Sequence, residues 1–327
     1  MPSARVSHHK EEKSSDSNLA VLVSPHLQEL SKTSPAIRKE FFPSPEELHS
    51  SNLAYDDPLL EEQYVQTKGL VHKYPKRVLI EVTLTCASYC RFCTRRRKVS
   101  DLQKGQTDKK DVDNMILYLK KHPEVNEIIF SGGDPFTAPT MLRYALQKIG
   151  SLPQITIVRI HTRVPISNPK LCTPEIFQIL KNIKQTLYVS LHFEHPDEIT
   201  PPTTAIIHKL RKIGAILLSQ SVFLKGVNDK YETLFVLFNR LSELGVRPYY
   251  IYRCDPVKGA EHFIVPFEKE IEIMTKLRKN LSGIAYPTYL VDTPDGSGKI
   301  PVPLSFWDFK KGYLTDFNGK RILLRQR

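Results

Sequence analysis

Three cysteines lie within eight residues of one another in the segment TCASYCRFCTRRR: Cys86, Cys90 and Cys93. Thiolates are soft ligands that favour iron–sulfur clusters or zinc. A structural zinc site needs four ligands, and only three are local here, although distant Cys172 or Cys254 could complete it. Three thiolates on a four-iron cluster would instead leave one iron open to bind another molecule. The C-x3-C-x2-C spacing therefore predicts a metal centre, with an iron–sulfur cluster favoured and zinc as the alternative.

Two segments that contain glycines could approach a ligand closely. In FSGGDPF, the adjacent Gly132 and Gly133 precede Asp134, and glycine lets backbone and ligand come together without a side chain between them. The segment DGSGK ends at Lys299, but it lacks the glycine five residues before Gly298 and the Ser or Thr after the lysine that a P-loop requires. Taken alone, the first segment is weak evidence for a site, since a tight turn between a strand and a helix also explains it. The alternative for the second segment is an exposed surface turn.

The chain must place these residues on a regular framework. Apolar, β-branched runs predict seven strands, over 78–84, 127–130, 155–160, 187–193, 215–224, 247–252 and 286–292. Helical periodicity lies between strands, over 111–122, 173–185, 230–245 and 266–281. Six or seven βα units in succession predict an α/β fold with a parallel sheet or barrel.

Chemically unusual residues occur at or near the carboxyl ends of all seven predicted strands. They are Cys86, the segment 131–134, His161 with Arg163, His192, Gln220, Cys254 with Asp255, and Asp292. Parallel α/β folds build their sites on this edge. We therefore expect these residues to meet in one site.

Composition excludes several classes of protein. No apolar run approaches the ~18 residues of a membrane span, the N-terminus has no apolar signal region, and clustered free cysteines indicate a reducing compartment, so a cytoplasmic location is expected. The formal net charge is +12, which fits nucleic acid, anionic substrates or solubility alone. Because the basic run 95–98 directly follows the cysteines, a small anionic molecule is favoured over nucleic acid as its partner.

The ends of the chain differ from its regular centre. Asn318-Gly319, between apolar runs, predicts a hairpin near the C-terminus. The expected divisions are a disordered N-terminus, a mostly helical extension, a catalytic barrel and a short tail, over 1–17, 18–70, 71–300 and 301–327.

The cysteine motif, with Phe92 before its last cysteine, resembles the radical S-adenosylmethionine superfamily. More narrowly, the chain resembles the lysine 2,3-aminomutase family over residues 55–305, in YPKRVLIEVTLTCASYCRFCTRRR, FSGGDPF, SLHFEHPDEIT, QSVFLKGVND, YRCDPVKGAEHF and VDTPDGSGK. This resemblance implies a partial, open parallel βα barrel of about six units, with an N-terminal mostly helical extension and a short C-terminal hairpin.

The resemblance also implies three cofactors. Cys86, Cys90 and Cys93 would hold a 4Fe–4S cluster, whose open iron binds S-adenosylmethionine and whose electron releases a 5′-deoxyadenosyl radical. Lys299 would form the Schiff base with pyridoxal 5′-phosphate. The remaining cofactor-binding residues that the resemblance implies are Lys73, Tyr74 and Arg77 for pyridoxal phosphate, and Gly132, Gly133, Asp134, His192 and Gln220 for S-adenosylmethionine.

Three residues would select the substrate if the resemblance holds. Arg95 matches the arginine that binds the amino-acid carboxylate, while Asp255 and Asp292 match the two aspartates that bind the ε-ammonium group. The predicted protein is therefore an isomerase, an intramolecular aminotransferase that interconverts L-lysine and L-β-lysine. A flavodoxin or ferredoxin would serve as its reductant, and a homo-oligomer is expected.

Two alternatives remain open on the sequence. The short tail and the basic charge also fit a branch that performs the same chemistry on a lysine of elongation factor P, the (R)-β-lysylation pathway, although Thr94, Arg97 and Asp292 favour the enzymes that act on free lysine. A nucleic-acid-binding protein stabilised by zinc or a cluster is the alternative from another class.

Overall fold

The computed structural model describes residues 19–99, 106–294, 296–304, 306–308 and 310–323, so the predicted disordered segment 1–17 lies outside the described residues. A single ten-stranded sheet follows the order of the chain from β1 to β10. Its seven central strands are all parallel. They are β3 (Arg77–Thr83), β4 (Glu127–Gly132), β5 (Ile157–Thr162), β6 (Thr186–His192), β7 (Ile216–Val222), β8 (Arg247–Tyr252) and β9 (Thr288–Asp292).

Antiparallel strands extend the sheet at both edges. β1 (Val65–Thr67) and β2 (Leu70–Tyr74) are added beside β3, and β10 (Lys299–Pro301) is added beside β9. β1 and β10 lie at opposite edges and do not pair with each other. The sheet is thus an open parallel barrel, as predicted, with additional edge strands that the sequence analysis does not predict.

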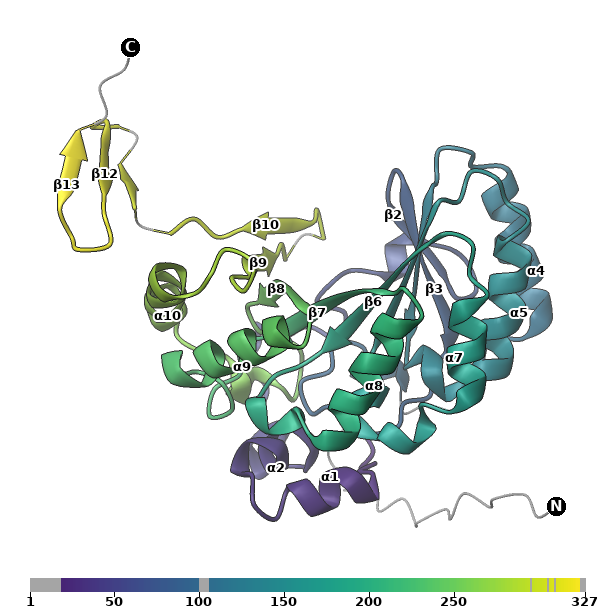
Figure 1. Ribbon diagram of the computed structural model, residues 1–327, viewed down its shortest axis with the longest axis horizontal. Coiled ribbons are helices and arrows are strands. Elements are labelled where there is room, and N and C mark those ends of the chain that lie inside the picture. The colour runs from purple at the N-terminus through teal and green to yellow at the C-terminus, as the bar shows by residue number, and fades with distance from the viewer. Residues whose placement is uncertain (1–18, 100–105, 295, 305, 309, 324–327) are drawn as a thin grey trace.

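Helices cover the outside of the curved sheet (Figure 1). The long ones are α4 (Lys109–Lys120), α5 (Pro139–Ile149), α7 (Pro174–Lys181), α8 (Pro201–Lys212), α9 (Tyr231–Glu243) and α10 (Phe267–Asn280). The sequence analysis does not predict α5 and α8, which both begin at proline. Proline is well tolerated in the first helical turn, because the N–H it lacks would have no partner there.

Several short helical segments join these elements. The short α-helices are α1 (Pro25–Leu30), α2 (Pro35–Phe41), α3 (Arg96–Val99) and α6 (Val164–Ser167). Single 3₁₀ turns occur at Pro45–Leu48, Glu62–Tyr64, Pro135–Thr137, Pro169–Leu171, Pro196–Glu198 and Glu261–Phe263.

Alternation along the strands separates the core from the inside of the barrel. On β5, Val158 and Ile160 are fully buried in the hydrophobic core beneath the helices. Arg159 and His161, the alternate residues, line a cavity inside the barrel. Because successive side chains of a strand point to opposite faces, the same apolar pattern that forms the core directs polar residues inward.

The N-terminal helices pack against the cysteine-containing loop that follows β3. The backbone N–H of Arg91 donates to the carbonyl of Glu40 at 2.8 Å, and that of Tyr89 donates to the carbonyl of Leu22 at 2.9 Å. The carboxylate of Glu47 accepts hydrogen bonds from the guanidinium groups of both Arg91 and Arg96. The N-terminal segment therefore fixes the conformation of the cysteine loop.

Replacing Glu47 with glutamine is expected to destabilise the fold by about 3 kcal/mol, because it leaves two buried guanidinium groups without a counter-charge. The side chains of Glu47 and Arg91 are each only 1% exposed. Urea unfolding measures the loss. Glu175→Gln is the control, since the Glu175–Arg143 pair is more than 40% exposed and such pairs contribute less than about 1 kcal/mol. Equal stability of the two variants would contradict the expectation.

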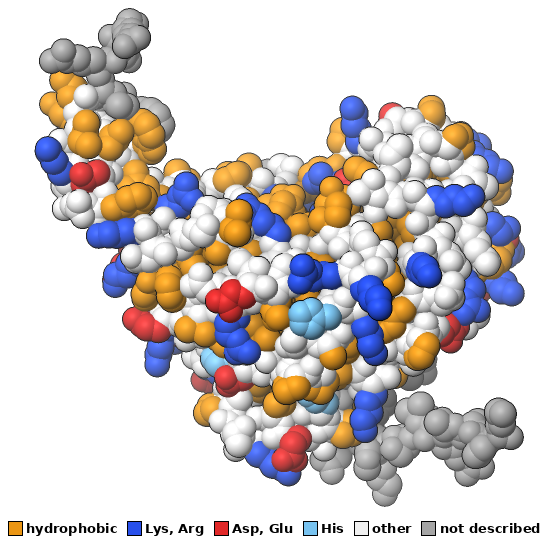
Figure 2. All heavy atoms as spheres, viewed as in Figure 1, with side chains coloured by type: hydrophobic (Ala, Val, Ile, Leu, Met, Phe, Trp, Pro, Cys, Tyr) orange, Lys and Arg blue, Asp and Glu red, His pale blue; other side chains and the backbone are white. Residues whose placement is uncertain are grey.

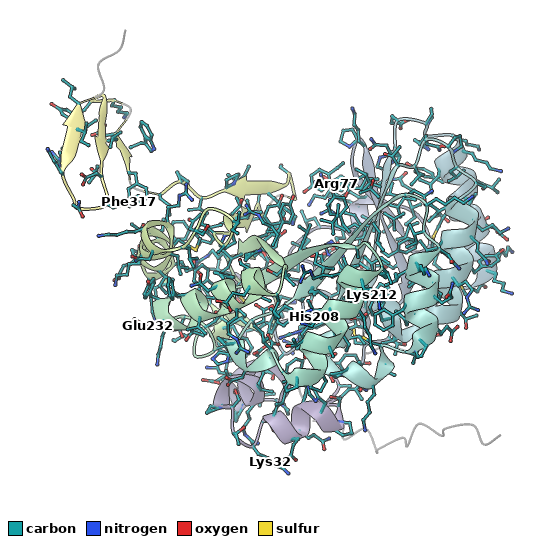
Figure 3. The ribbon with its side chains drawn as sticks, in the orientation of Figure 1. Lys32, Arg77, His208, Lys212, Glu232 and Phe317 are labelled. Atoms are coloured by element: carbon teal, nitrogen blue, oxygen red, sulfur yellow. The ribbon has the colours of Figure 1, made fainter. Side chains whose placement is uncertain are left out.

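A small three-stranded sheet follows the barrel. It consists of β11 (Trp307–Asp308), β12 (Tyr313–Thr315) and β13 (Arg321–Leu323), with the predicted hairpin at Asn318-Gly319 joining the last two. This sheet projects from the barrel, with the labelled Phe317 in the loop that joins β12 to β13 (Figure 3). No helix among the described residues has the length and apolar character needed to span a membrane.

Candidate active site

Two adjoining cavities, of about 250 and 220 Å³, occupy the inside of the barrel. Most of the residues expected at the site line one or both of them. The residues that line both cavities are Leu59, Thr94, Arg95, Ser131, His161, His192, Gln220, Tyr252, Asp292 and Lys299. The predicted convergence at the carboxyl ends of the strands is therefore present, and the two cavities form one continuous site.

The three clustered cysteines line the second cavity on the loop between β3 and α3. Burial raises the pKa of each thiol, and it raises that of Cys90 to about 12. Mutual repulsion contributes to the raised pKa of Cys86, since Cys93 and Cys90 both lie close enough to affect it. Free thiols here would be protonated at neutral pH, so binding of a metal would have to release their protons.

The three cysteines face one common space. Among residues 19–99, 106–294 and the other described positions, no three His, Cys, Asp or Glu side chains are arranged to hold one metal ion. In a four-iron cluster each thiolate binds a different iron, so the cysteines need only face a common space, which Cys86, Cys90 and Cys93 do.

A buried arginine contacts one of these cysteines. Nη1 of Arg163 donates to Sγ of Cys90 at 2.8 Å, and Nη2 donates to the carboxylates of Glu40 and Glu198. The guanidinium also lies 5.2 Å from the centre of the Phe92 ring. A fixed N–H donor at this position would stabilise negative charge on the sulfur of Cys90.

The paired glycines allow two strand-end loops to pack closely. A Cβ on Gly132 would lie 2.4 Å from the carbonyl oxygen of Thr83, and one on Gly133 would lie 2.3 Å from that of Thr85. Gly132 also has a φ of 107°, which L side chains rarely adopt. The glycines are thus required first by backbone packing, and this packing brings residues 131–134 to the cavity wall.

Asp134 organises the same loop. Its carboxylate accepts hydrogen bonds from the backbone N–H groups of Arg163, Val164 and Phe136 and from the hydroxyl of Thr162. Burial raises its pKa to about 6 in spite of these bonds, which oppose the shift. The side chain connects the ends of β4 and β5 while lining the second cavity.

Two histidines face each other inside the barrel. The rings of His161 and His192 meet edge to face with centroids 5.6 Å apart, and burial lowers the pKa of His192 to about 3. The Nε2 atoms of both rings are buried and lack a hydrogen-bond partner among the described residues. With Gln220 on the neighbouring strand, these neutral imidazoles offer hydrogen bonds to a polar ligand.

The residues expected near pyridoxal phosphate lie toward the other end of the barrel. Lys73 and Tyr74 end β2, Arg77 begins β3, and all three line the first cavity. Figure 3 shows Arg77 at the edge of the molecule opposite Lys32, which follows α1. The guanidinium of Arg77 lies 3.8 Å from the centre of the Tyr74 ring. Two cations at this end of the cavity suit a phosphate group.

Lys299 and Asp292 form a cross-strand ion pair. The two residues are direct partners in the antiparallel pairing of β10 with β9, and Nζ of Lys299 donates to both carboxylate oxygens of Asp292 at 2.8 and 2.9 Å. Asp255 lines the same cavity, where burial and then the charge of Asp292 raise its pKa to about 7. The ammonium group of Lys299 is thus bound by Asp292, and Asp255 lines the cavity close enough for both charges to affect it.

The basic run after the cysteines is neutralised within the protein. Arg95 forms a two-point interaction with Glu61, Arg96 pairs with Glu47, and Arg97 pairs with Asp57. Elsewhere, Figure 2 shows Lys and Arg side chains distributed over one face of the molecule among apolar atoms, without a continuous basic patch. Of the basic run 95–98, Arg95 is the residue that lines both cavities, so it is the candidate for binding a small anionic molecule there.

Comparisons with known proteins agree with this geometry. Residues 80–237 match the model of the radical SAM superfamily. An L-lysine 2,3-aminomutase from Acetoanaerobium sticklandii is 39% identical over 294 residues, which are 88% of this chain and 68% of that protein. The chain belongs to the lysine 2,3-aminomutase family. Two further lysine 2,3-aminomutases match over 64% and 62% of their length, so this family member spans about two thirds of the length of these relatives.

Relatives in the lysine 2,3-aminomutase family differ in the substrate that their names give. A glutamate 2,3-aminomutase from Clostridioides difficile is 35% identical over 247 residues, or 75% of this chain and 58% of that protein. A radical SAM methyltransferase from Sphaerobacter thermophilus has a TM-score of 0.50 and 16% identity, covering 69% of this chain and 70% of its own, and it supports the fold alone. The predicted family and fold are confirmed, while the substrate must be inferred from the site.

Sequence reasoning does not select several residues that line the site or contact it. Glu61 and Tyr252 line the cavities, and Glu81 lies 3.5 Å from Nε of Arg95. A charged residue within the apolar run VLIEVTL is a signal that could have indicated Glu81. Glu61 gives no such signal, because the acidic stretch around it is indistinguishable from an exposed loop.

Proposed function

We propose that this protein is an L-lysine 2,3-aminomutase, an isomerase that moves the α-amino group of L-lysine to the β-carbon. The observation that supports this proposal most strongly is the pattern of charge in the cavity. Arg95 offers a cation on one wall, and Asp255 and Asp292 offer two carboxylates beside Lys299. An α-carboxylate and an ε-ammonium group are the complementary charges, and free lysine carries both.

The same pattern discriminates against the substrates of relatives. A glutamate side chain would bring a carboxylate toward Asp255 and Asp292, and like charges in a buried site are strongly unfavourable. A lysine within a polypeptide, as in elongation factor P, has no free carboxylate for Arg95 to bind. Free L-lysine therefore satisfies the charges of the cavity best.

The residues of the site fit the three expected cofactors. Cys86, Cys90 and Cys93 would hold a 4Fe–4S cluster, which with S-adenosylmethionine supplies a carbon-centred radical for hydrogen abstraction. Lys299 would attach pyridoxal 5′-phosphate, which supplies delocalisation for a migrating amine. His192 and Gln220 would contact S-adenosylmethionine, since they line the cavity that the cysteines share.

The chain's own groups bind and orient the substrate in this proposal. Arg95 fixes the carboxylate end, and the two aspartates fix the ammonium end, so that the β-carbon is held between them. Attachment of Nζ of Lys299 to pyridoxal phosphate would remove its ion pair with Asp292 and leave this carboxylate available to the ammonium group of the substrate. Leu59, which lines both cavities, helps to exclude water from the reacting atoms.

The affinity for L-lysine is expected to rise about tenfold between pH 6 and pH 8. Burial and Asp292 raise the pKa of Asp255 to about 7, so this carboxyl is mostly protonated below pH 7 and ionised above it. Only the ionised form attracts an ammonium group. Calorimetric titration of the cofactor-loaded, unreduced protein measures the profile, and Asp255→Asn should flatten it. An affinity that falls with rising pH would contradict the assignment.

Turnover by anaerobically reconstituted protein tests the proposal. With S-adenosylmethionine, pyridoxal phosphate and dithionite, L-lysine should be converted and L-glutamate should not. Replacing both Asp255 and Asp292 with asparagine should lower kcat/KM for L-lysine by at least about a hundredfold, since two charge partners of the ammonium group are lost. Preferential turnover of L-glutamate by the unaltered protein would refute the assignment of substrate.

A further inference from the structure

Arg95 is held by a carboxylate from outside the barrel strands. Nε and Nη2 of Arg95 donate to the two carboxylate oxygens of Glu61 at 2.8 and 2.6 Å, and Nη1 donates to the hydroxyl of Ser131 at 3.0 Å. The side chains of Arg95 and Glu61 are 15% and 9% exposed. A planar two-point interaction of this kind fixes the orientation of the guanidinium as well as its position.

The segment that carries Glu61 is itself anchored. Nζ of Lys73 donates to the carbonyl of Leu59 at 3.1 Å, and Arg97 pairs with Asp57 at 2.8 Å. Leu60 adopts a φ of 48°, an unfavourable conformation for a leucine that the surrounding contacts must maintain. Glu61 is therefore a fixed partner for Arg95.

Glu61 leaves part of Arg95 available. A guanidinium has five N–H donors, of which Glu61 and Ser131 use three. One N–H on Nη1 and one on Nη2 remain without an acceptor within the part of the chain that the structure describes. Since Arg95 lines both cavities, these two donors can bind a carboxylate there.

We propose that Glu61 is a positioning residue that aims the free donors of Arg95 at the carboxylate of the substrate. This inference rests on the proposed function, because it takes Arg95 to be the group that binds the carboxylate. Glu61 need not touch the substrate. It acts by holding Arg95 in the one orientation in which two N–H groups face the cavity.

A competing carboxylate explains why Arg95 needs to be held. Oε1 of Glu81 lies 3.5 Å from Nε of Arg95, and it is buried without a hydrogen-bond partner among the described residues. If Glu61 lost its charge, Glu81 would become the stronger partner and would turn the guanidinium toward β3. The N–H groups of Arg95 would then point away from the carboxylate of the substrate. We expect this loss of affinity to exceed the gain that comes from removing the negative charge of Glu61.

Calorimetric titration of the cofactor-loaded, unreduced protein tests this inference. The probes are L-lysine and 1,5-diaminopentane, which keeps both amines of lysine but lacks the carboxylate. Glu61→Gln is expected to weaken L-lysine binding about tenfold and to leave diamine binding unchanged. Glu62→Gln is the matched control, since Glu62 is 63% exposed and contacts Arg97 rather than Arg95. It should bind both probes as the unaltered protein does.

The double variant Glu61→Gln/Glu81→Gln separates positioning from general damage. Removing the competitor should restore most of the affinity for L-lysine, which a merely unfolded or loosened site would not do. Three results would overturn this inference without affecting the proposed function. They are unchanged or tighter L-lysine binding by Glu61→Gln, an equal loss of affinity for both probes, and no restoration of affinity in the double variant. Unaltered protein that fails to bind L-lysine would overturn the proposed function, and this inference with it.

Discussion

Replacing Lys299 with alanine is expected to lower turnover of L-lysine by more than about a thousandfold and to remove the absorbance of bound pyridoxal phosphate. Nζ of Lys299 is the amine that would attach this cofactor, and its neighbours Asp292 and Tyr252 keep it inside the cavity. Loss of a covalently acting residue removes a whole reaction path rather than a single contact. Borohydride reduction followed by peptide mass spectrometry should locate the cofactor on Lys299 in the unaltered protein.

The matched control for Lys299→Ala is Lys276→Ala. Lys276 lies on the exposed face of α10 and pairs with Glu272, one turn away. This variant should retain both the pyridoxal absorbance and turnover. Covalent trapping on a different lysine, or full activity of Lys299→Ala, would disprove the assigned role of Lys299.

Replacing Cys90 with serine is expected to reduce bound iron from about four per chain to near zero and to abolish turnover. Serine keeps the size of the side chain but replaces the soft thiolate with a hydroxyl, which binds iron–sulfur clusters poorly. Iron analysis together with the visible absorption spectrum measures the loss after anaerobic reconstitution. Cys86→Ser and Cys93→Ser should behave in the same way, since all three thiols face one cavity.

Cys172→Ala serves as the control for the three cysteine variants. Cys172 is packed against the main hydrophobic core and does not line the cavity that contains the three cysteines. Its removal should leave the iron content unchanged. Retention of a full cluster by Cys90→Ser, or its loss in Cys172→Ala, would show that the predicted ligand set is wrong.

The central part of the fold could be predicted because its strands are rich in apolar and β-branched residues. Runs such as VLIEVTL and LYVSLHF are nearly continuous in apolar and β-branched residues, which distinguishes them from helices. Once these strands are parallel, their carboxyl ends must lie together, so the convergence of His192, Gln220 and Asp292 follows from the order of the chain. The family could also be recognised from the sequence, because its motifs occur at these strand ends.

The remaining features depend on contacts between distant residues. β10 contains only Lys299–Pro301, and it is a strand only because β9 supplies the partner edge. The pairing of Arg95 with Glu61 joins residues 34 positions apart across a loop that has no periodicity of its own. A sequence shows how many ionisable groups a segment has, but it does not show which of them form ion pairs with one another. The basic run 95–98 was therefore expected to bind an anion, whereas most of its charges are paired within the protein.

The most direct test of the proposed function is nuclear magnetic resonance of L-[2-15N]lysine after incubation with the reconstituted protein, S-adenosylmethionine, pyridoxal phosphate and reductant. The proposed function predicts β-lysine with the 15N label bonded to carbon 3, formed only when both cofactors and the reductant are present. Unchanged L-lysine from protein that holds an intact cluster and bound pyridoxal phosphate would contradict it.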